Sequence, residues 1–131
     1  MLSHSVLLVE DDAMLGPLYV ELLSQAGYAV EHVCNAHDAL EYLAHRDVEL
    51  VLLDIMLPEV SGVELLHDCR QMCMSMDKPL PIFIMLSNLH QLALQEQLIA
   101  QGATAFLVKS DHTPDQFLHA IHAHLPSNVL P

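Results

Sequence analysis

The segment from Glu49 to Gly62, with the sequence ELVLLDIMLPEVSG, constrains the fold of this chain more than any other. Residues 51–53 are consecutive and apolar, a pattern typical of a central strand that is buried on both faces of a parallel sheet. The apolar run ends at Asp54, and a loop that contains proline and glycine follows. Ligands of open α/β sheets bind in the crevice beyond the carboxyl ends of the strands. Asp54 is therefore a candidate for chemistry, although an acid at this position can also simply begin a turn.

The rest of the chain alternates short apolar runs with segments whose apolar residues recur at intervals of three and four. The first pattern indicates strands and the second indicates helices. The other predicted strands are Ser5–Val9, Tyr28–Val33, Ile82–Leu86 and Ala103–Val108. The predicted helices lie between Asp12 and Gly27, and over Ala36–Ala44, Val63–Met72, Leu89–Gln101 and Pro114–Leu125. This alternation, without a linker, predicts one doubly wound α/β domain around a five-stranded parallel sheet with right-handed crossovers.

Two of these helices carry more specific expectations. Asp12 can cap the first helix, because its carboxylate can accept the free amide hydrogens of the first turn. Gly16 and Pro17 are unfavourable early in a helix, so we expect either a late start near Pro17 or a bend there. In the fourth helix, the residues expected to pack against the core are Leu92, Leu94, Leu98 and Ile99.

Composition and charge narrow the classes of function. The 131 residues suffice for one domain, and a hydrophobic fraction of 53% argues against disorder. The formal net charge is −13 with only four Lys and Arg residues, which argues against binding to the phosphates of nucleic acid. No apolar run has the length of a membrane span, and the N-terminus lacks the features of a secretory signal. The sequence therefore predicts a soluble, cytoplasmic protein that binds neither nucleic acid nor membrane.

The cysteines and a histidine cluster give weaker indications of metal binding. Three cysteines without a secretory signal indicate reduced thiols. Cys69 and Cys73 lie one helical turn apart, but no second Cys/His pair with zinc spacing follows, so we interpret them as small buried residues. His119, His122 and His124 cluster on the last predicted helix. Because no carboxylate or cysteine completes a ligand set there, we favour a solvent-facing or partner-facing surface over a metal or pH-sensing role.

Polar residues stand at the carboxyl ends of four predicted strands, namely Glu10 and Asp11, Asp54, Ser87 and Lys109. A parallel sheet brings these ends to one edge, so residues that are distant in sequence become neighbours. Three converging carboxylates repel one another unless a cation lies among them, and oxygen ligands suit Mg²⁺. An aspartate beside Mg²⁺ and a lysine can attack a phosphoryl group, because both cations stabilise the transferring oxygens. The constellation predicts an aspartyl-phosphate site, with Ser87 as a hydrogen-bond donor to the product.

At this point the sequence resembles a known family, the receiver domains of bacterial two-component response regulators. The resemblance covers nearly the whole chain and rests on the motifs LLVEDD, LLDIMLPEVSGVELL, IFIMLS and AFLVKS. It implies a flavodoxin-like fold with strand order 2-1-3-4-5. It also implies Mg²⁺-dependent transfer of a phosphoryl group from a phosphohistidine, carried by a sensor histidine kinase or a histidine phosphotransfer protein. A receiver domain of this kind is a phosphoacceptor and not a dedicated enzyme.

The resemblance assigns a role to each matching position. Asp54 corresponds to the phosphoacceptor, Lys109 to the active-site lysine, and Gly62 to the small residue that opens the third helix. The implied metal ligands are Glu10, Asp11, Asp54 and the backbone carbonyl of Met56, and the implied switch residues are Ser87 and Phe106. Phosphorylation would change the surface of the fourth helix, fifth strand and fifth helix, which would then control a downstream protein or output domain.

The sequence departs from the family pattern after two site residues. Ser110 follows Lys109 where the family usually has proline, which removes the reason to expect the family's cis peptide bond there. Asn88 follows Ser87 where a smaller residue is usual, and this narrows the expected access to the phosphoryl group.

Two other functions were weighed against this one. A phosphatase of the haloacid dehalogenase type also uses a nucleophilic aspartate, but it needs a second acid two residues later, where this chain has Met56. A receiver-like interaction module that takes no phosphate remains an alternative. We expect a receiver domain over residues 1–126 and a short tail over residues 127–131. A sequence that ends at Pro131 leaves open whether it is a stand-alone regulator or a fragment of a longer protein.

Overall fold

The computed structural model describes residues 4–125, which form five strands, five α-helices and one short 3₁₀-helix. The strands are β1 (Ser5–Val9), β2 (Ala29–Val33), β3 (Leu50–Asp54), β4 (Ile82–Ser87) and β5 (Ala105–Val108). The helices are α1 (Leu15–Gln25), α2 (Ala36–His45), α3 (Gly62–Ser75), α4 (Leu92–Ala100) and α5 (Pro114–His122), and the 3₁₀-helix η1 spans Lys109–Asp111. The predicted alternation of strands and helices is confirmed.

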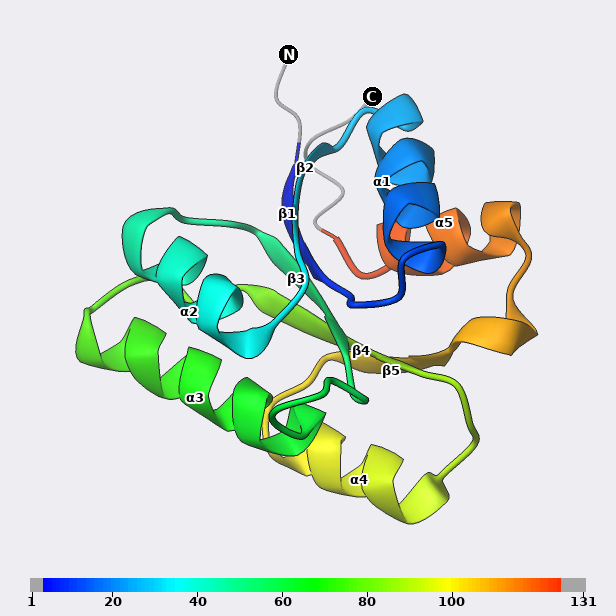
Figure 1. The fold of residues 1–131 in the computed structure, drawn as a ribbon. Coiled ribbons are helices and arrows are strands. Elements are labelled where there is room, and N and C mark those ends of the chain that lie inside the picture. The colour runs from blue at the N-terminus through cyan, green and yellow to red at the C-terminus, as the bar shows by residue number, and fades with distance from the viewer. Residues whose placement is uncertain (1–3, 126–131) are drawn as a thin grey trace.

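The five strands form one parallel sheet in the order β2-β1-β3-β4-β5, with β3 at its centre. Helices α1 and α5 cover one face of the sheet, and α2, α3 and α4 cover the other (Figure 1). Val51 and Leu53 of β3 pack under α2, α3 and α4, whereas Leu50 and Leu52 pack under α1 and α5. Burial on both faces explains why this strand has no alternating polar residues. The predicted flavodoxin-like fold and its strand order are confirmed.

The register of the sheet aligns the ends of neighbouring strands. Val9 pairs with Leu53, Asp54 pairs with Leu86, and Ser87 pairs with Val108. The residues that follow β1 and β5 therefore reach the same edge as the last residues of β3 and β4. This register is what positions the polar residues predicted from the sequence.

Helix α1 begins at Leu15, two residues before Pro17. A proline is tolerated within the first turn because the amide hydrogens of that turn have no partner inside the helix. Asp12 performs the predicted capping function, since its Oδ1 accepts hydrogen bonds from the amides of Met14 and Leu15, each at 2.8 Å. The expected late start near Pro17 is therefore replaced by a start that Asp12 stabilises two residues earlier.

Helix α4 begins at Leu92 and not at Leu89 as predicted. The Ser87 hydroxyl bonds both the carbonyl and the amide of Leu89, which closes a turn directly after β4 and delays the helix. Leu98 is fully buried, but Leu92 is 70% exposed and Ile99 is 42% exposed, so the predicted packing of these two residues is wrong. They lie seven residues apart on the outer side of the helix, where apolar spacing alone does not distinguish the two sides.

Three smaller expectations concern the rest of the described chain. Cys69 and Cys73 are buried, as predicted for small core residues. Every peptide bond within residues 4–125 is trans, in agreement with the absence of proline at Ser110. No helix in that range is both long and apolar enough to span a bilayer. The predicted tail, residues 127–131, lies outside the described residues.

Candidate functional site

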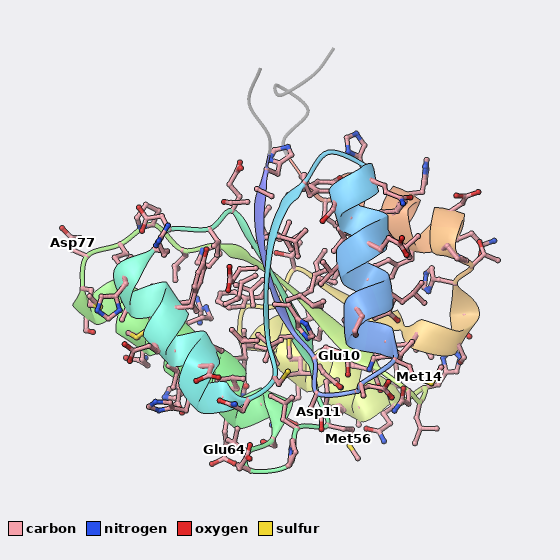
Figure 2. The ribbon with its side chains drawn as sticks, turned by 45° about the horizontal axis from the view of Figure 1, so that its top comes forward. Glu10, Asp11, Met14, Met56, Glu64 and Asp77 are labelled. Carbon is pink, nitrogen blue, oxygen red and sulfur yellow. The ribbon has the colours of Figure 1, made fainter. Side chains whose placement is uncertain are left out.

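The carboxyl ends of β1 and β3 bring three acidic residues together. Carboxylate oxygens of Glu10, Asp11 and Asp54 lie within 4.8 Å of one another. Figure 2 shows Glu10 and Asp11 at the end of β1, with Met14 and Met56 at the same edge of the sheet. Among residues 4–125, no other group of three His, Cys, Asp or Glu side chains is this close. The convergence predicted from the strand ends is present.

Lys109 joins two of these carboxylates. Its Nζ donates hydrogen bonds to Oε1 of Glu10 at 2.7 Å and to Oδ2 of Asp54 at 3.2 Å. The Lys109 side chain is only 7% exposed, and the Glu10 side chain is fully buried. Hydrogen bonds between charged groups are stronger than those between neutral groups, and burial limits their screening by water. The lysine is therefore held in place beside both acids.

Burial and crowding change the proton affinity of these groups. The pKa of Glu10 is raised from 4.5 to about 7, mainly by burial and also by the neighbouring Asp54 carboxyl, while Lys109 acts in the opposite direction. Burial alone lowers the pKa of Lys109, but the carboxylates of Glu10 and Asp54 outweigh this effect and raise it. One buried ammonium group therefore only partly compensates for three nearby carboxylates.

The loop after β3 folds back directly beside Asp54. The amide of Met56 donates to Oδ1 of Asp54 at 3.0 Å, and the amide of Gly62 donates to the carbonyl of Ile55 at 2.9 Å. A Cβ atom on Gly62 would lie 2.7 Å from Cα of Ile55, so only glycine fits at this approach. Glycine at this position lets α3 start close to the end of β3. The Met56 side chain is 67% exposed at the edge of the site.

Asp11 and Asp12 have different environments although they are adjacent. Asp12 is turned to the start of α1, and its bonds to the amides of Leu15 and Met14 lower its pKa. Asp11 instead belongs to the acidic cluster with Glu10 and Asp54. This difference agrees with the interpretation of Asp12 as a helix cap and Asp11 as a candidate metal ligand.

The two predicted switch residues, Ser87 and Phe106, have other partners than the acidic cluster. The buried Ser87 hydroxyl donates to the carbonyl of Leu89 at 2.9 Å and accepts from the Leu89 amide at 3.1 Å. Phe106 is half-buried and packs against the core on the side of α2, α3 and α4. Ser87 therefore lies at the predicted edge of the sheet, but its hydroxyl forms hydrogen bonds with Leu89 of the loop that follows β4.

One contact to the acidic pair was not predicted from the sequence. Nε2 of His32, near the end of β2, lies 2.8 Å from the carbonyl oxygen of Glu10. The signal was difficult to recognise, because residues 10 and 32 become neighbours only through the pairing of β1 with β2. His32 lies in β2, an edge strand in which exposed and half-buried residues alternate at Ala29–His32. Its position in the sequence therefore resembles that of any other half-buried residue of an edge strand.

The residues present fit a divalent metal ion with hard oxygen ligands. The side chains of Glu10, Asp11 and Asp54 offer only oxygen atoms, the type of ligand that Mg²⁺ prefers. Three carboxylates converge here beside the single amine of Lys109, which contacts only two of them, so negative charge exceeds positive charge at the site. A divalent cation among these oxygens would remove that excess. The arrangement can therefore hold such an ion next to Asp54 and Lys109.

A protein-family model described as the response regulator receiver domain matches residues 6–122. Among curated proteins, the transcriptional regulatory protein MalR of Bacillus subtilis is 29% identical over 139 residues, covering 96% of this chain and 57% of its own length. The uncharacterized transcriptional regulatory protein YrkP of the same organism is 34% identical over 101 residues, covering 77% of this chain and 41% of its own length. The chain thus spans about half the length of these relatives.

Solved structures have the same fold. The signal receiver domain of a putative LuxO repressor protein from Vibrio parahaemolyticus superposes with a TM-score of 0.80 at 29% identity, covering 94% of this chain and 90% of that one. A response regulator receiver domain protein from Methanospirillum hungatei gives a TM-score of 0.81 at 25% identity, with 93% of each chain covered. The family match over residues 6–122 includes all five strands apart from Ser5, and with them the edge at which the acidic cluster lies.

Proposed function

Because this chain belongs to the family of response regulator receiver domains, we propose that it accepts a phosphoryl group on Asp54 in a Mg²⁺-dependent reaction. The main support is the position of Lys109, whose amine contacts both Asp54 and Glu10. A lysine in this position can stabilise the negative oxygens of a transferring phosphoryl group. The donor is a phosphohistidine on a sensor histidine kinase or a histidine phosphotransfer protein. A carboxylate oxygen of Asp54 bonds to phosphorus as the phosphorus–nitrogen bond of the donor breaks, and the electron pair of that bond stays on the donor imidazole.

The ligands for Mg²⁺ would be the side chains of Glu10, Asp11 and Asp54, together with the backbone carbonyl of Met56. When bound, the ion would neutralise charge on the phosphoryl oxygens and bring them close to Asp54. The chain's own residues prepare the acceptor. The Met56 amide holds Oδ1 of Asp54, and Lys109 holds Oδ2, so the carboxylate is oriented before the donor arrives.

The change of shape would begin at Ser87. A phosphoryl group on Asp54 adds nearly two negative charges and new acceptor oxygens beside Lys109. The Ser87 hydroxyl would leave its bonds to Leu89 and donate to one of these oxygens, which moves the loop before α4. Phe106 would then turn into the space that this loop vacates. The element with two alternative arrangements is thus the surface formed by α4, β5 and α5.

The partner of this surface would be a protein. Apart from Lys109, the segment 89–125 contains no Lys or Arg, so it offers no basic patch for nucleic acid. A downstream protein, or an output domain in the same polypeptide, would meet glutamine, histidine and apolar side chains. We assign the receiver function to residues 1–126 and place its action in the cytoplasm, where histidine kinases present their phosphodonor.

Acetyl phosphate tests the acceptor directly. Incubation with acetyl phosphate and Mg²⁺ should add the mass of one phosphoryl group to the wild type, and chelation with EDTA should prevent it. Asp54→Asn should abolish the addition, whereas Asp12→Asn is the matched control and should keep it. Equal labelling of the Asp54 variant would show that the acceptor is another residue. A wild type that takes no label although it binds Mg²⁺ would favour the phosphate-independent interaction module.

A further inference from the structure

The backbone of Glu10 is held from both sides by β2. Its amide donates to the carbonyl of Val33 at 3.1 Å, and its carbonyl lies 2.8 Å from Nε2 of His32. A backbone carbonyl can only accept a hydrogen bond, so the imidazole must carry a proton on Nε2 and donate it. The carbonyl in question belongs to the peptide that joins Glu10 to Asp11. His32 thus contacts the peptide between the two members of the acidic pair.

The first turn of α1 leaves room for this imidazole. Gly16 is buried there, and a Cβ atom on it would lie 2.4 Å from Cε1 and 2.7 Å from Nε2 of His32. Its backbone is not in the left-handed region, so glycine is needed here for space and not for conformational freedom. The imidazole is therefore confined between the helix start and the Glu10 carbonyl. A ring with so little room has few other rotamers.

We propose that His32 is a positioning residue for the metal site, acting through the peptide that links Glu10 and Asp11. The orientation of this peptide sets the direction of both side chains, because Glu10 points into the protein and Asp11 points to solvent. In the proposed site, Glu10 must reach both Lys109 and the Mg²⁺ ion. Asp11 must reach the same Mg²⁺ ion from the opposite side of the peptide. A hydrogen bond that fixes the peptide fixes both directions at once. This inference rests on the function proposed above.

The expected effect has the size typical of groups that orient metal ligands. Loss of such a partner commonly reduces metal affinity 10- to 100-fold. His32 acts on the backbone and not on a ligand atom, and Val33 still holds the Glu10 amide. We therefore expect a loss of Mg²⁺ affinity of about 10-fold, at the lower end of that range.

The first test compares two replacements of His32. His32→Leu removes the donor but fills much of the same space, and His32→Gln keeps an N–H group that can reach the carbonyl. Mg²⁺ affinity is measured at pH 8 by titration of backbone amide chemical shifts, and stability is measured separately by urea unfolding in EDTA. His32→Leu should weaken Mg²⁺ binding about 10-fold, and His32→Gln should bind within about threefold of the wild type. If His32 only filled space, the replacements would lower stability, and His32→Gln would bind Mg²⁺ no better than His32→Leu. That result would overturn the inference.

Gly16 supplies an independent test of the same contact. Gly16→Ala should push the imidazole away from the carbonyl and weaken Mg²⁺ binding. In a His32→Ala background, the added methyl group meets empty space, so Gly16→Ala should then leave Mg²⁺ affinity unchanged. Equal losses in both backgrounds would show that Gly16 does not act through His32. Cys34→Ser is the matched control, since the Cys34 sulfur lies 4.0 Å from the same Nε2, whereas the hydrogen bonds to the backbone of Glu10 come from Val33 and His32.

A spectroscopic measurement separates this inference from the proposed function. In EDTA, ¹⁵N spectra of the imidazoles should show His32 with its proton on Nε2, and the opposite tautomer would overturn the inference. Failure of the wild type to bind Mg²⁺ would refute the proposed metal site, and the positioning role with it. Wild-type binding that is unchanged in His32→Leu would refute the positioning role alone.

Discussion

Replacing Glu10 with glutamine should make the metal-free protein more stable at pH 8. Glu10 is fully buried, and its pKa is raised from 4.5 to about 7, so folding disfavours the charged carboxylate. Glutamine has nearly the same shape and no charge. Lys109 keeps its second partner, because its bond to Asp54 at 3.2 Å does not involve Glu10.

The magnitude follows from the linkage between protonation and folding. A tenfold change in proton affinity corresponds to about 1.4 kcal/mol, so a pKa that rises from 4.5 to about 7 gives roughly 3 kcal/mol at most. The folded state binds more protons than the unfolded state between these pH values, so stability falls as the pH rises through this window. At pH 8 both states are charged and the full cost applies. We expect Glu10→Gln to raise the free energy of unfolding by about 1–3 kcal/mol at pH 8 and by little at pH 4.5.

Urea unfolding in EDTA at several pH values between 4.5 and 8 measures this effect. The wild type should lose stability across the range more steeply than Glu10→Gln. Asp12→Asn is a control without such a slope, because hydrogen bonds from backbone amides lower the pKa of Asp12. The stability that its charge contributes is lost only as the pH falls below the ordinary pKa of 3.8, so this variant should not change the pH slope between 4.5 and 8. If Glu10→Gln left both the stability at pH 8 and the pH slope unchanged, the burial of a charged Glu10 would not carry the cost inferred here.

Three further outcomes are expected. Asp11→Ala should weaken Mg²⁺ binding in a shift titration at least tenfold more than Asp12→Ala, and equal losses would contradict the assignment of Asp11 as the ligand. Gly62→Ala should lower the free energy of unfolding by about 1–3 kcal/mol in urea, since its Cβ would overlap Cα of Ile55; an unchanged midpoint would refute the close approach. Beryllofluoride with Mg²⁺ should shift amide signals in α4 and α5 of the wild type, and Ser87→Ala should confine the shifts to the loop after β3. Shifts that reach α5 equally in both proteins would show that the hydroxyl is not part of the switch.

The sequence alone predicted the fold and the convergence of the site residues because both follow from the same rule. Apolar strands that alternate with helices form a parallel sheet, and a parallel sheet brings its carboxyl ends to one edge. Glu10, Asp54 and Lys109 could therefore be placed together without knowledge of any contact. Asp12 could be separated from Asp11 because capping by aspartate depends on local spacing only.

Contacts that depend on side-chain direction could not be predicted in this way. The Ser87 hydroxyl bonds Leu89, and this local turn competes with the first turn of a helix that the apolar pattern extended to Leu89. Helix α4 also has leucine on both sides, so spacing did not identify Leu92 as exposed. The contact of His32 required the register of β1 against β2, which no local pattern encodes.

The electrostatics of the site connect its fold to its proposed chemistry. Three carboxylates converge, Lys109 contacts only two of them, and the burial of a charged Glu10 disfavours folding. This cost would favour binding of a divalent ion, because each carboxylate would then gain a positively charged partner. Transfer of a phosphoryl group to Asp54 would add negative charge again, and Lys109, which already contacts Asp54, and the hydroxyl of Ser87 at the end of β4 would be donors to it. A site with full charge compensation before the donor arrives would have less reason to bind Mg²⁺ and less reason to rearrange afterwards.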